Sequence, residues 1–121
     1  MATTATLDAR TATMLTVERM GRVVVATLAR PPVNALDGVL VGELEALVGD
    51  VCADPDVAVL HVRSSQSVFC AGADLALMQA CLATPEGTAA MIDVVRRMQR
   101  LFSRLEAAPA VTLAELGGAA L

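Results

Sequence analysis

The sequence predicts an α/β domain in which strands and helices alternate along the chain. β-branched side chains gather at residues 23–25, where their stiffness suits a pleated strand. An apolar run of strand length follows at residues 57–62, as expected for a strand covered on both faces. Between them, apolar residues recur at helical spacing: Leu40, Leu44, Leu47, Val48 and Val51. This alternation indicates parallel strands joined by right-handed crossovers.

The N-terminal part is expected to open with a hairpin. Residues 14–17 and 22–28 flank Gly21 as two extended arms flank a tight turn. Pro31 stops the second arm because proline removes a donor from the strand ladder. Residues 1–13 are rich in Thr and Ala without a clear period, and we expect them to form a mobile leader.

Capping residues mark where the predicted helices begin. Asp37 precedes the first helix, and Asp74 precedes a short second one, since an aspartate can accept hydrogen bonds from the free N–H groups of a first turn. Thr84, followed by proline, is expected to cap a third helix that runs to Glu106. A final strand is predicted over residues 111–116.

Composition excludes several functions. The 121 residues are 55% apolar but include only two Phe and neither Trp nor Tyr, so the core must be aliphatic. Thirteen acids against nine arginines and no lysines give a net charge of -4, which disfavours nucleic acid as a partner. The apolar runs are short and interrupted by charges, so no membrane partner is expected.

Cysteine and histidine usage points to a reducing compartment and to no metal. Cys52, Cys70 and Cys81 show neither an even count nor CxxC spacing, which favours reduced thiols in the cytoplasm. His61 is the only histidine and stands apart from other ligand types, so it is assigned a packing role.

The loop after the second predicted parallel strand is the best candidate for a binding site. Ligands of open α/β folds gather at the carboxyl ends of strands. Ala71, Gly72 and Ala73 lie there, and their small side chains leave backbone N–H groups accessible to an anionic or carbonyl oxygen. The alternative is purely structural, with Gly72 permitting a tight turn and Asp74 capping a helix. The dinucleotide and P-loop glycine patterns are absent.

Three stretches together resemble the enoyl-CoA hydratase/isomerase, or crotonase, family. Residues 68–75, Val-Phe-Cys-Ala-Gly-Ala-Asp-Leu, resemble its central signature. Residues 30–36 resemble its Arg-Pro…Asn-Ala-Leu turn, and residues 111–121 resemble the strand that leads to its second glycine loop. The resemblance implies a crotonase-like (ClpP/crotonase) fold of repeated ββα units, of which residues 14–121 would form the N-terminal portion.

The resemblance also implies a function. It predicts an enzyme that processes acyl-CoA thioesters and stabilises an enolate in an oxyanion hole, with hydration of 2-enoyl-CoA in fatty-acid or related metabolism as the default. An isomerase or another crotonase reaction is the first alternative; a non-catalytic acyl-CoA-binding or assembly subunit, or an inactive fragment, is the second. No cofactor is implied beyond the coenzyme A of the substrate, and a homo-oligomer, a trimer or dimer of trimers, is expected.

Matching the motif assigns roles to particular residues. The backbone N–H of Ala71 would be the first oxyanion donor. The acyl-CoA site would be lined by Ala71, Gly72, Ala73 and Asp74, with Arg30 as a candidate for the CoA phosphates. The family's second oxyanion glycine and its acid/base glutamates match no residue up to Leu121, so we expect a domain truncated before that glycine.

The remaining candidates are given structural roles. Glu115 lies in an apolar strand, where burial could make it an acid/base, but a structural ion pair or a solvent-facing position is preferred. Cys70 is interpreted as a small apolar filler because no basic partner stands near it in the sequence. The row of Arg96, Arg100 and Arg104 is interpreted as a solvated helix face, with CoA phosphates or a partner's acidic face as alternatives.

Overall fold

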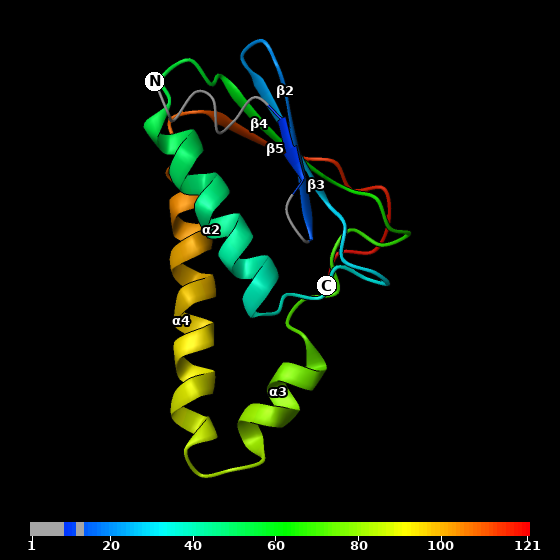
Figure 1. Cartoon of the computed structure of the whole chain (residues 1–121), viewed down its shortest axis with the longest axis vertical. Coiled ribbons are helices and arrows are strands. Elements are labelled where there is room, and N and C mark those ends of the chain that lie inside the picture. Colours follow the sequence, from blue (N-terminus) through cyan, green and yellow to red (C-terminus); the bar gives the residue numbers. More distant parts are fainter. Residues whose placement is uncertain (1–8, 12–13) are drawn as a thin grey trace.

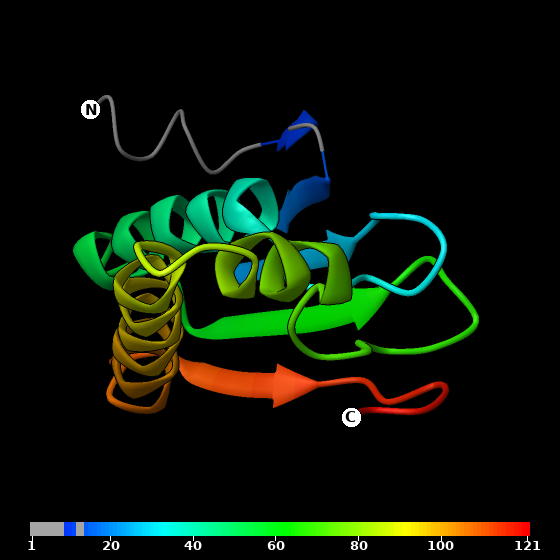
Figure 2. The same ribbon diagram turned by 90° about the horizontal axis from the view of Figure 1, so that it is seen from below.

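A computed structural model describes residues 9–11 and 14–121 of the chain. One mixed sheet carries helices against one of its faces (Figures 1 and 2). The strands, in chain order and also in sheet order, are β1 (Ala9–Thr11), β2 (Leu15–Met20), β3 (Val23–Leu28), β4 (Val59–Ser64) and β5 (Val111–Ala114). The helices are α2 (Gly38–Ala53), α3 (Leu75–Leu82) and α4 (Gly87–Glu106).

The sheet changes from antiparallel to parallel at β3. Strands β1, β2 and β3 pair antiparallel, whereas β3 with β4 and β4 with β5 pair parallel, as the alternating pattern predicted. The predicted hairpin is confirmed, and Gly21 takes φ +61° in its turn. The second parallel strand begins later than predicted because Val57 N–H donates to the Asp54 carbonyl oxygen in a turn. The last strand ends at Ala114, two residues earlier than predicted.

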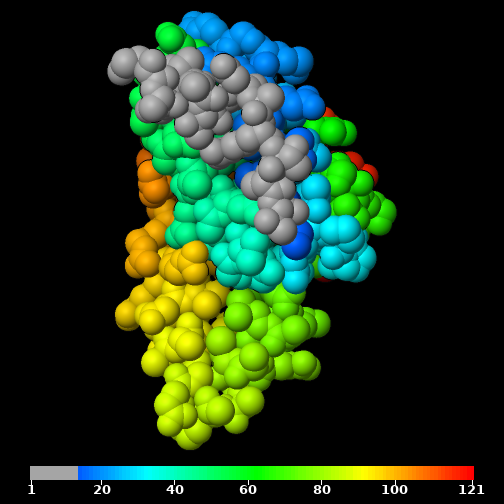
Figure 3. Space-filling model, viewed as in Figure 1, coloured from blue at the N-terminus to red at the C-terminus, as the bar shows by residue number. Residues whose placement is uncertain are grey.

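The core lies between the sheet and α2. Its fully or nearly fully buried side chains are aliphatic, which confirms the expectation from composition. Leu15, Val24 and Leu60 point from the sheet toward Leu40 and Leu47 of α2 within this single cluster. Helix α4 packs beside α2, as the space-filling view shows, and adds Met98 and Leu101 to the same core (Figure 3).

Part of the predicted leader is ordered as a strand. Within residues 1–13, Ala9–Thr11 form β1 and pair with β2 in the register Arg10↔Val17, so the expectation of a mobile leader is wrong for these three residues. Residues 1–8 and 12–13 lie outside the described residues. In the part of the chain that the structure describes, each helix is too short or too polar to cross a membrane.

Two of the three predicted caps are confirmed. Asp37 accepts a hydrogen bond from Leu40 N–H and Asp74 accepts one from Leu77 N–H, both at 2.9 Å. The third helix begins three residues after Thr84, because Thr84 Oγ1 and its carbonyl oxygen both accept from Gly87 N–H in a preceding turn. Helix α4 therefore starts at Gly87, without a side-chain cap.

Gly87 and Gly38 provide a matched pair for testing the junction between α3 and α4. Both are the first residue of a helix, but a Cβ on Gly87 would overlap the Cys81 carbonyl oxygen, whereas one on Gly38 would meet nothing within 4 Å. We expect Gly87→Ala to lower the free energy of unfolding by about 1–3 kcal/mol, as overpacking does. Gly38→Ala should change it by less than about 0.5 kcal/mol or raise it slightly. Urea denaturation followed by circular dichroism measures both; equal effects would contradict the close packing at Gly87.

Candidate functional site

Three chain segments meet at the carboxyl ends of the parallel strands. Residues 30–36 follow β3, residues 65–74 follow β4 and residues 115–121 follow β5 (Figure 1). The middle segment is bonded on one side to the first, where Leu36 pairs with Ala73 in a parallel bridge, and on the other side to the third, where Cys70 pairs with Ala120. The sequence-predicted loop thus lies where an open α/β sheet places its ligand.

Asn34 joins these segments from the interior. Its side chain is fully buried, and its amide nitrogen donates to Ser64 Oγ at 2.7 Å and to the Phe69 carbonyl oxygen at 3.0 Å. Its side-chain oxygen accepts from Arg30 N–H at 2.9 Å. The backbone of Asn34 is left-handed, with φ +54°, a conformation that Asn tolerates better than most residues. Asn34 was not among the predicted site residues, although an Asn in a turn after a strand is a recognisable signal for this conformation.

Two glycines shape the junction of the three segments, one through its backbone conformation and one through close packing. Gly72 adopts φ +89°, which favours glycine, and the position of its missing Cβ lies 3.5 Å from the Leu121 carbonyl oxygen. A Cβ on Gly118 would overlap the Ser67 carbonyl oxygen. Gly118 is therefore required by the packing of backbone against backbone, whereas Gly72 is required by its positive φ. The turn role considered for Gly72 is present in the structure.

Arg30 and Asp74 form an ion pair that is tied to two helix caps. Arg30 Nη1 donates to Asp74 Oδ2 at 2.7 Å, and its Nε lies 3.3 Å from Asp37 Oδ2. Arg30 Nη1 also donates to the Ala35 carbonyl oxygen. A guanidinium held by two carboxylates is poorly placed to neutralise a phosphate, so the predicted contact of Arg30 with CoA has no support from this geometry. Arg30 instead links the N-terminal caps of α2 and α3.

Asp74 is likewise fully engaged in the fold. Its Oδ1 accepts from Leu77 N–H, and its Oδ2 accepts from Arg30. The backbone hydrogen bond from Leu77, followed by that from Arg30, lowers the pKa of this carboxyl below its ordinary value. Asp74 is therefore ionised near neutral pH and acts as a cap, the structural alternative that the sequence left open.

The backbone N–H groups of residues 71–73 differ in whether they already donate a hydrogen bond within the protein. Ala71 N–H, the predicted oxyanion donor, donates to the Val33 carbonyl oxygen at 3.0 Å. Gly72 N–H lies 3.4 Å from Cys70 Sγ. Among the described residues, Ala73 N–H finds no acceptor. A ligand oxygen could bind the Ala71 N–H only by displacing the Val33 carbonyl oxygen, whereas the Ala73 N–H has no hydrogen bond to displace.

The register of the parallel bridge explains the direction of the Ala73 N–H. Leu36 N–H donates to the Gly72 carbonyl oxygen, and Asp74 N–H donates to the Leu36 carbonyl oxygen. In such a bridge the residue between the two bonded groups turns its own N–H away from the partner strand. The N–H of Ala73 therefore points to the opposite side of the loop, the side on which residues 119–121 run.

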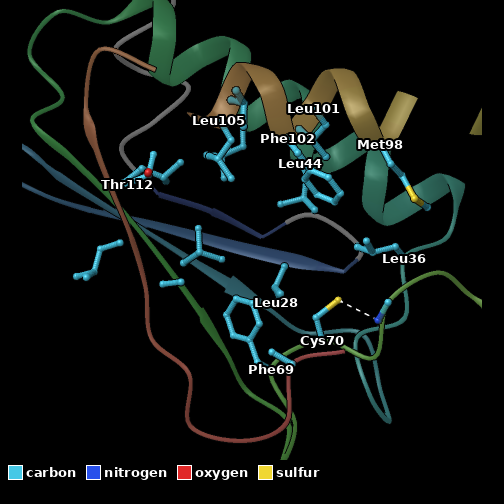
Figure 4. A pocket seen from close by; sticks show the side chains of 18 of the residues that line it. Leu28, Leu36, Leu44, Phe69, Cys70, Met98, Leu101, Phe102, Leu105 and Thr112 are labelled. Carbon is cyan, nitrogen blue, oxygen red and sulfur yellow. Dashed lines mark hydrogen bonds between the residues drawn. The ribbon is translucent and has the colours of Figure 1, made fainter. Parts of the chain in front are cut away.

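A cavity of about 460 Å³ adjoins this loop. Side chains of α4, among them Met98, Leu101 and Phe102, face Leu28 and Phe69 across it (Figure 4). The loop contributes Cys70, Gly72 and Ala73 to its wall. Of the described residues along this wall none carries a charged side chain, so the cavity suits an apolar group held next to a hydrogen-bond donor.

The other sequence candidates lie away from this cavity or serve the fold. Glu115 Oε1 lies 3.0 Å from His61 Nε2 and its Oε2 lies 3.7 Å from Arg63 Nε, with the Glu115 side chain half exposed. This confirms the preferred ion-pair role for Glu115. Cys70 lines the cavity as a small side chain, and its thiol also donates to the Asn34 carbonyl oxygen at 3.3 Å.

Solved structures with the same arrangement define the fold. DspI of Pseudomonas aeruginosa superposes with a TM-score of 0.80 at 28% identity, covering 92% of this chain and 41% of that one. An enoyl-CoA hydratase from Mycobacterium smegmatis superposes with a TM-score of 0.79 at 28% identity, covering 87% of this chain and 40% of that one. The α/β fold is therefore the crotonase fold, as the resemblance implied.

Sequence comparison places the chain within a family. The sequence model of the enoyl-CoA hydratase/isomerase family matches residues 18–121, so the chain belongs to this family. A probable enoyl-CoA hydratase of Rhizobium meliloti is 44% identical over 66 residues, which cover 54% of this chain and 26% of that protein. The mouse protein "Enoyl-CoA hydratase domain-containing protein 2, mitochondrial" is 38% identical over 89 residues, which cover 73% of this chain and 28% of that protein. The matched regions span about a quarter of the length of these curated relatives.

Replacing Asn34 tests whether its amide holds the loop. We expect Asn34→Ala to lower the free energy of unfolding by about 2–4 kcal/mol, because buried partners lose their hydrogen bonds and Ala tolerates the left-handed backbone poorly. Asn34→Gly relieves the backbone but not the lost bonds, so it should be less damaging by about 1 kcal/mol. Chemical denaturation separates the two; stability unchanged in both variants would show that the amide does not hold the junction.

The pKa of Asp74 predicts a dependence of stability on pH. Because the folded-state pKa lies below 3.8, the ionised carboxylate stabilises the fold above about pH 4, and this contribution is lost as pH falls through the folded pKa. Asp74→Asn should therefore flatten the fall in unfolding free energy below pH 4. Asp93→Asn, an exposed change on α4, is the control. Identical pH profiles for the wild type and Asp74→Asn would refute the stabilising role of this carboxylate.

Proposed function

We propose that the chain binds an acyl-CoA thioester, places the acyl group in the apolar cavity and receives the thioester carbonyl oxygen at the N–H of Ala73. The observation that carries this proposal is a backbone donor without an acceptor among the described residues, beside an uncharged cavity wall. This revises the predicted donor from Ala71 to Ala73, while Gly72 and Ala73 stay as lining residues.

The chemistry follows from the charge that develops on the thioester. When a proton leaves the carbon next to the carbonyl group, or water adds to a 2-enoyl thioester, negative charge gathers on the carbonyl oxygen. A donor already fixed in position stabilises that charge without reorganisation, and one such donor is often worth about 3–4 kcal/mol. In the whole protein we assign this stabilisation to the hydration of a 2-enoyl-CoA, in fatty-acid or related metabolism.

The uncharged wall of the cavity favours a second candidate, acyl-CoA binding without turnover. Hydration needs a group that moves a proton, usually a carboxylate or a histidine within hydrogen-bond reach of the substrate. No described carboxylate lines the cavity, and Glu115 is paired with His61 outside it. The described residues thus supply binding and charge stabilisation, and the choice between hydratase, isomerase and silent binder depends on proton-transfer groups.

Two further proposals concern assembly and location. Large apolar side chains are exposed at Val111, Leu113 and Leu121, and surfaces of this kind support association into a homo-oligomer, for which we propose a trimer or a dimer of trimers. The three cysteines are free in the structure, which supports a reducing compartment such as the cytoplasm.

Removing the Ala73 N–H tests the proposed donor. Ala73→Pro deletes that N–H, and we expect a loss of about 100-fold or more in kcat for crotonyl-CoA hydration, followed by the absorbance of the enoyl thioester, while thioester binding measured by calorimetry persists. Leu75→Pro is the matched control, because it puts the same ring at the first position of α3, where proline is tolerated. Circular dichroism checks that both variants fold.

The same measurements separate the two candidates. Thioester binding by the wild-type chain without any absorbance change would favour the silent binder over the hydratase. Failure to bind any acyl-CoA would overturn both. Equal activity of Ala73→Pro and Leu75→Pro would overturn the assignment of Ala73.

A further inference from the structure

Helix α4 has two faces of opposite chemistry. Met98, Leu101 and Phe102 turn toward the apolar cavity (Figure 4). At about 100° per residue, Arg100 lies about 200° around the helix from Met98. Arg96 and Arg104, one turn before and after Arg100, extend a row of cations along this opposite face. The row is therefore separate from the proposed acyl-CoA site.

The neighbouring helix does not neutralise this row. Glu45 of α2 is the acid that meets α4, and Arg97 Nη2 donates to its Oε1 at 2.6 Å. The hydrogen bond from Arg97 is the largest cause that lowers the pKa of Glu45, and the charges of Arg100 and Arg104 lower it further. One carboxylate thus stands among several guanidinium groups and is already paired with Arg97.

Three arginines remain without a partner in the described part of the chain. Arg96, Arg100 and Arg104 form no hydrogen bond or ion pair there, and all three are exposed. Together with Gln99 and Ser103 they line a groove of about 350 Å³, named here the arginine groove. Its side chains offer guanidinium, amide and hydroxyl donors side by side.

Gly49 of α2 lies beside the arginine groove. The guanidinium of Arg104 lies 3.6 Å from the place that a Cβ of Gly49 would occupy. This is an ordinary van der Waals distance, so Arg104 packs beside this position of α2. The side of the arginine groove formed by Arg104 therefore lies against α2.

We propose that the arginine groove binds an acidic helical segment of a partner protein. Residues four apart on a helix are about 6 Å apart along its axis, so Arg96, Arg100 and Arg104 present cations at that repeat. Carboxylates at positions i, i+4 and i+8 of a partner helix have the same repeat and meet the three guanidinium groups in register. Arginine also pairs with carboxylates through two parallel hydrogen bonds.

Other polyanions fit the arginine groove less well. Asp93 lies on the same face one turn before Arg96 and Arg97, so a long chain of phosphates would meet a negative charge there. The net charge of -4 and the scarcity of aromatic side chains also disfavour nucleic acid. A second copy of this chain is disfavoured too, because none of the described helices carries acids at i, i+4 and i+8.

Fluorescence anisotropy of the full chain with a labelled helical peptide tests the proposal. The peptide carries Glu at three positions four residues apart in an Ala- and Gln-rich sequence, and the control peptide carries Gln at those positions. We expect only the acidic peptide to bind, and R100E to weaken binding about fivefold or more, since one exposed ion pair contributes up to about 1 kcal/mol. R63E makes the same charge change outside the arginine groove and should alter affinity less than about twofold. Added salt should weaken binding because it screens exposed charges.

Three results would overturn the proposal. The first is that R100E and R63E have equal effects, which would make the attraction a property of net charge. The second is that the acidic peptide does not bind although circular dichroism shows the chain to be folded. The third is that tripolyphosphate or a single-stranded oligonucleotide binds more tightly than the peptide and is weakened by R100E, which would make the arginine groove a phosphate site.

Discussion

The buried amide of Asn34 is the constraint on which the site depends. It bonds the segment after β3 to the end of β4 and to the loop that follows β4, with no exposure to solvent. A buried amide that loses a partner costs far more than the net gain of an ordinary hydrogen bond, so these bonds fix the spacing of the segments closely. The backbone of Asn34 is left-handed, and its side-chain amide is directed into the interior. A local backbone conformation therefore accompanies hydrogen bonds to residues 30 or more positions away.

From this junction the direction of the Ala73 N–H, the proposed donor, follows in two steps. Once the first segment is fixed, Leu36 pairs with Ala73, and the register of that bridge turns the Ala73 N–H away from it. Gly118 then lets the third segment lie against the loop, where a side chain would overlap the Ser67 carbonyl oxygen, and Gly72 allows the left-handed turn of the loop. The site is therefore built from backbone, and side chains act on it through packing and helix caps.

Because the site is built from backbone groups, the sequence could predict only part of the structure. The caps at Asp37 and Asp74, the parallel strands and the family were predictable because each leaves a local pattern of a few residues. Which of the two alanine N–H groups is unbonded was not predictable, because Ala71 and Ala73 are chemically alike and differ only in their pairing with a segment more than 30 residues earlier. The same holds for Arg30, whose partner Asp74 lies 44 residues away in the chain. A leader rich in Thr and Ala gave no sign that Ala9–Thr11 would pair with β2.

The proposed backbone donor would separate two tasks that an enzyme acting on thioesters has to perform. Stabilising the charge on a thioester oxygen needs only an N–H in the right direction, and in our proposal the fold provides it for every residue 73 except proline. Moving a proton needs a carboxylate or an imidazole with a suitable pKa, and such groups can change without altering the sheet, the junction at Asn34 or the cavity. A scaffold that keeps the first task constant can therefore serve several reactions, because the second task alone selects among them. This separation is consistent with a family whose name joins hydration to isomerisation.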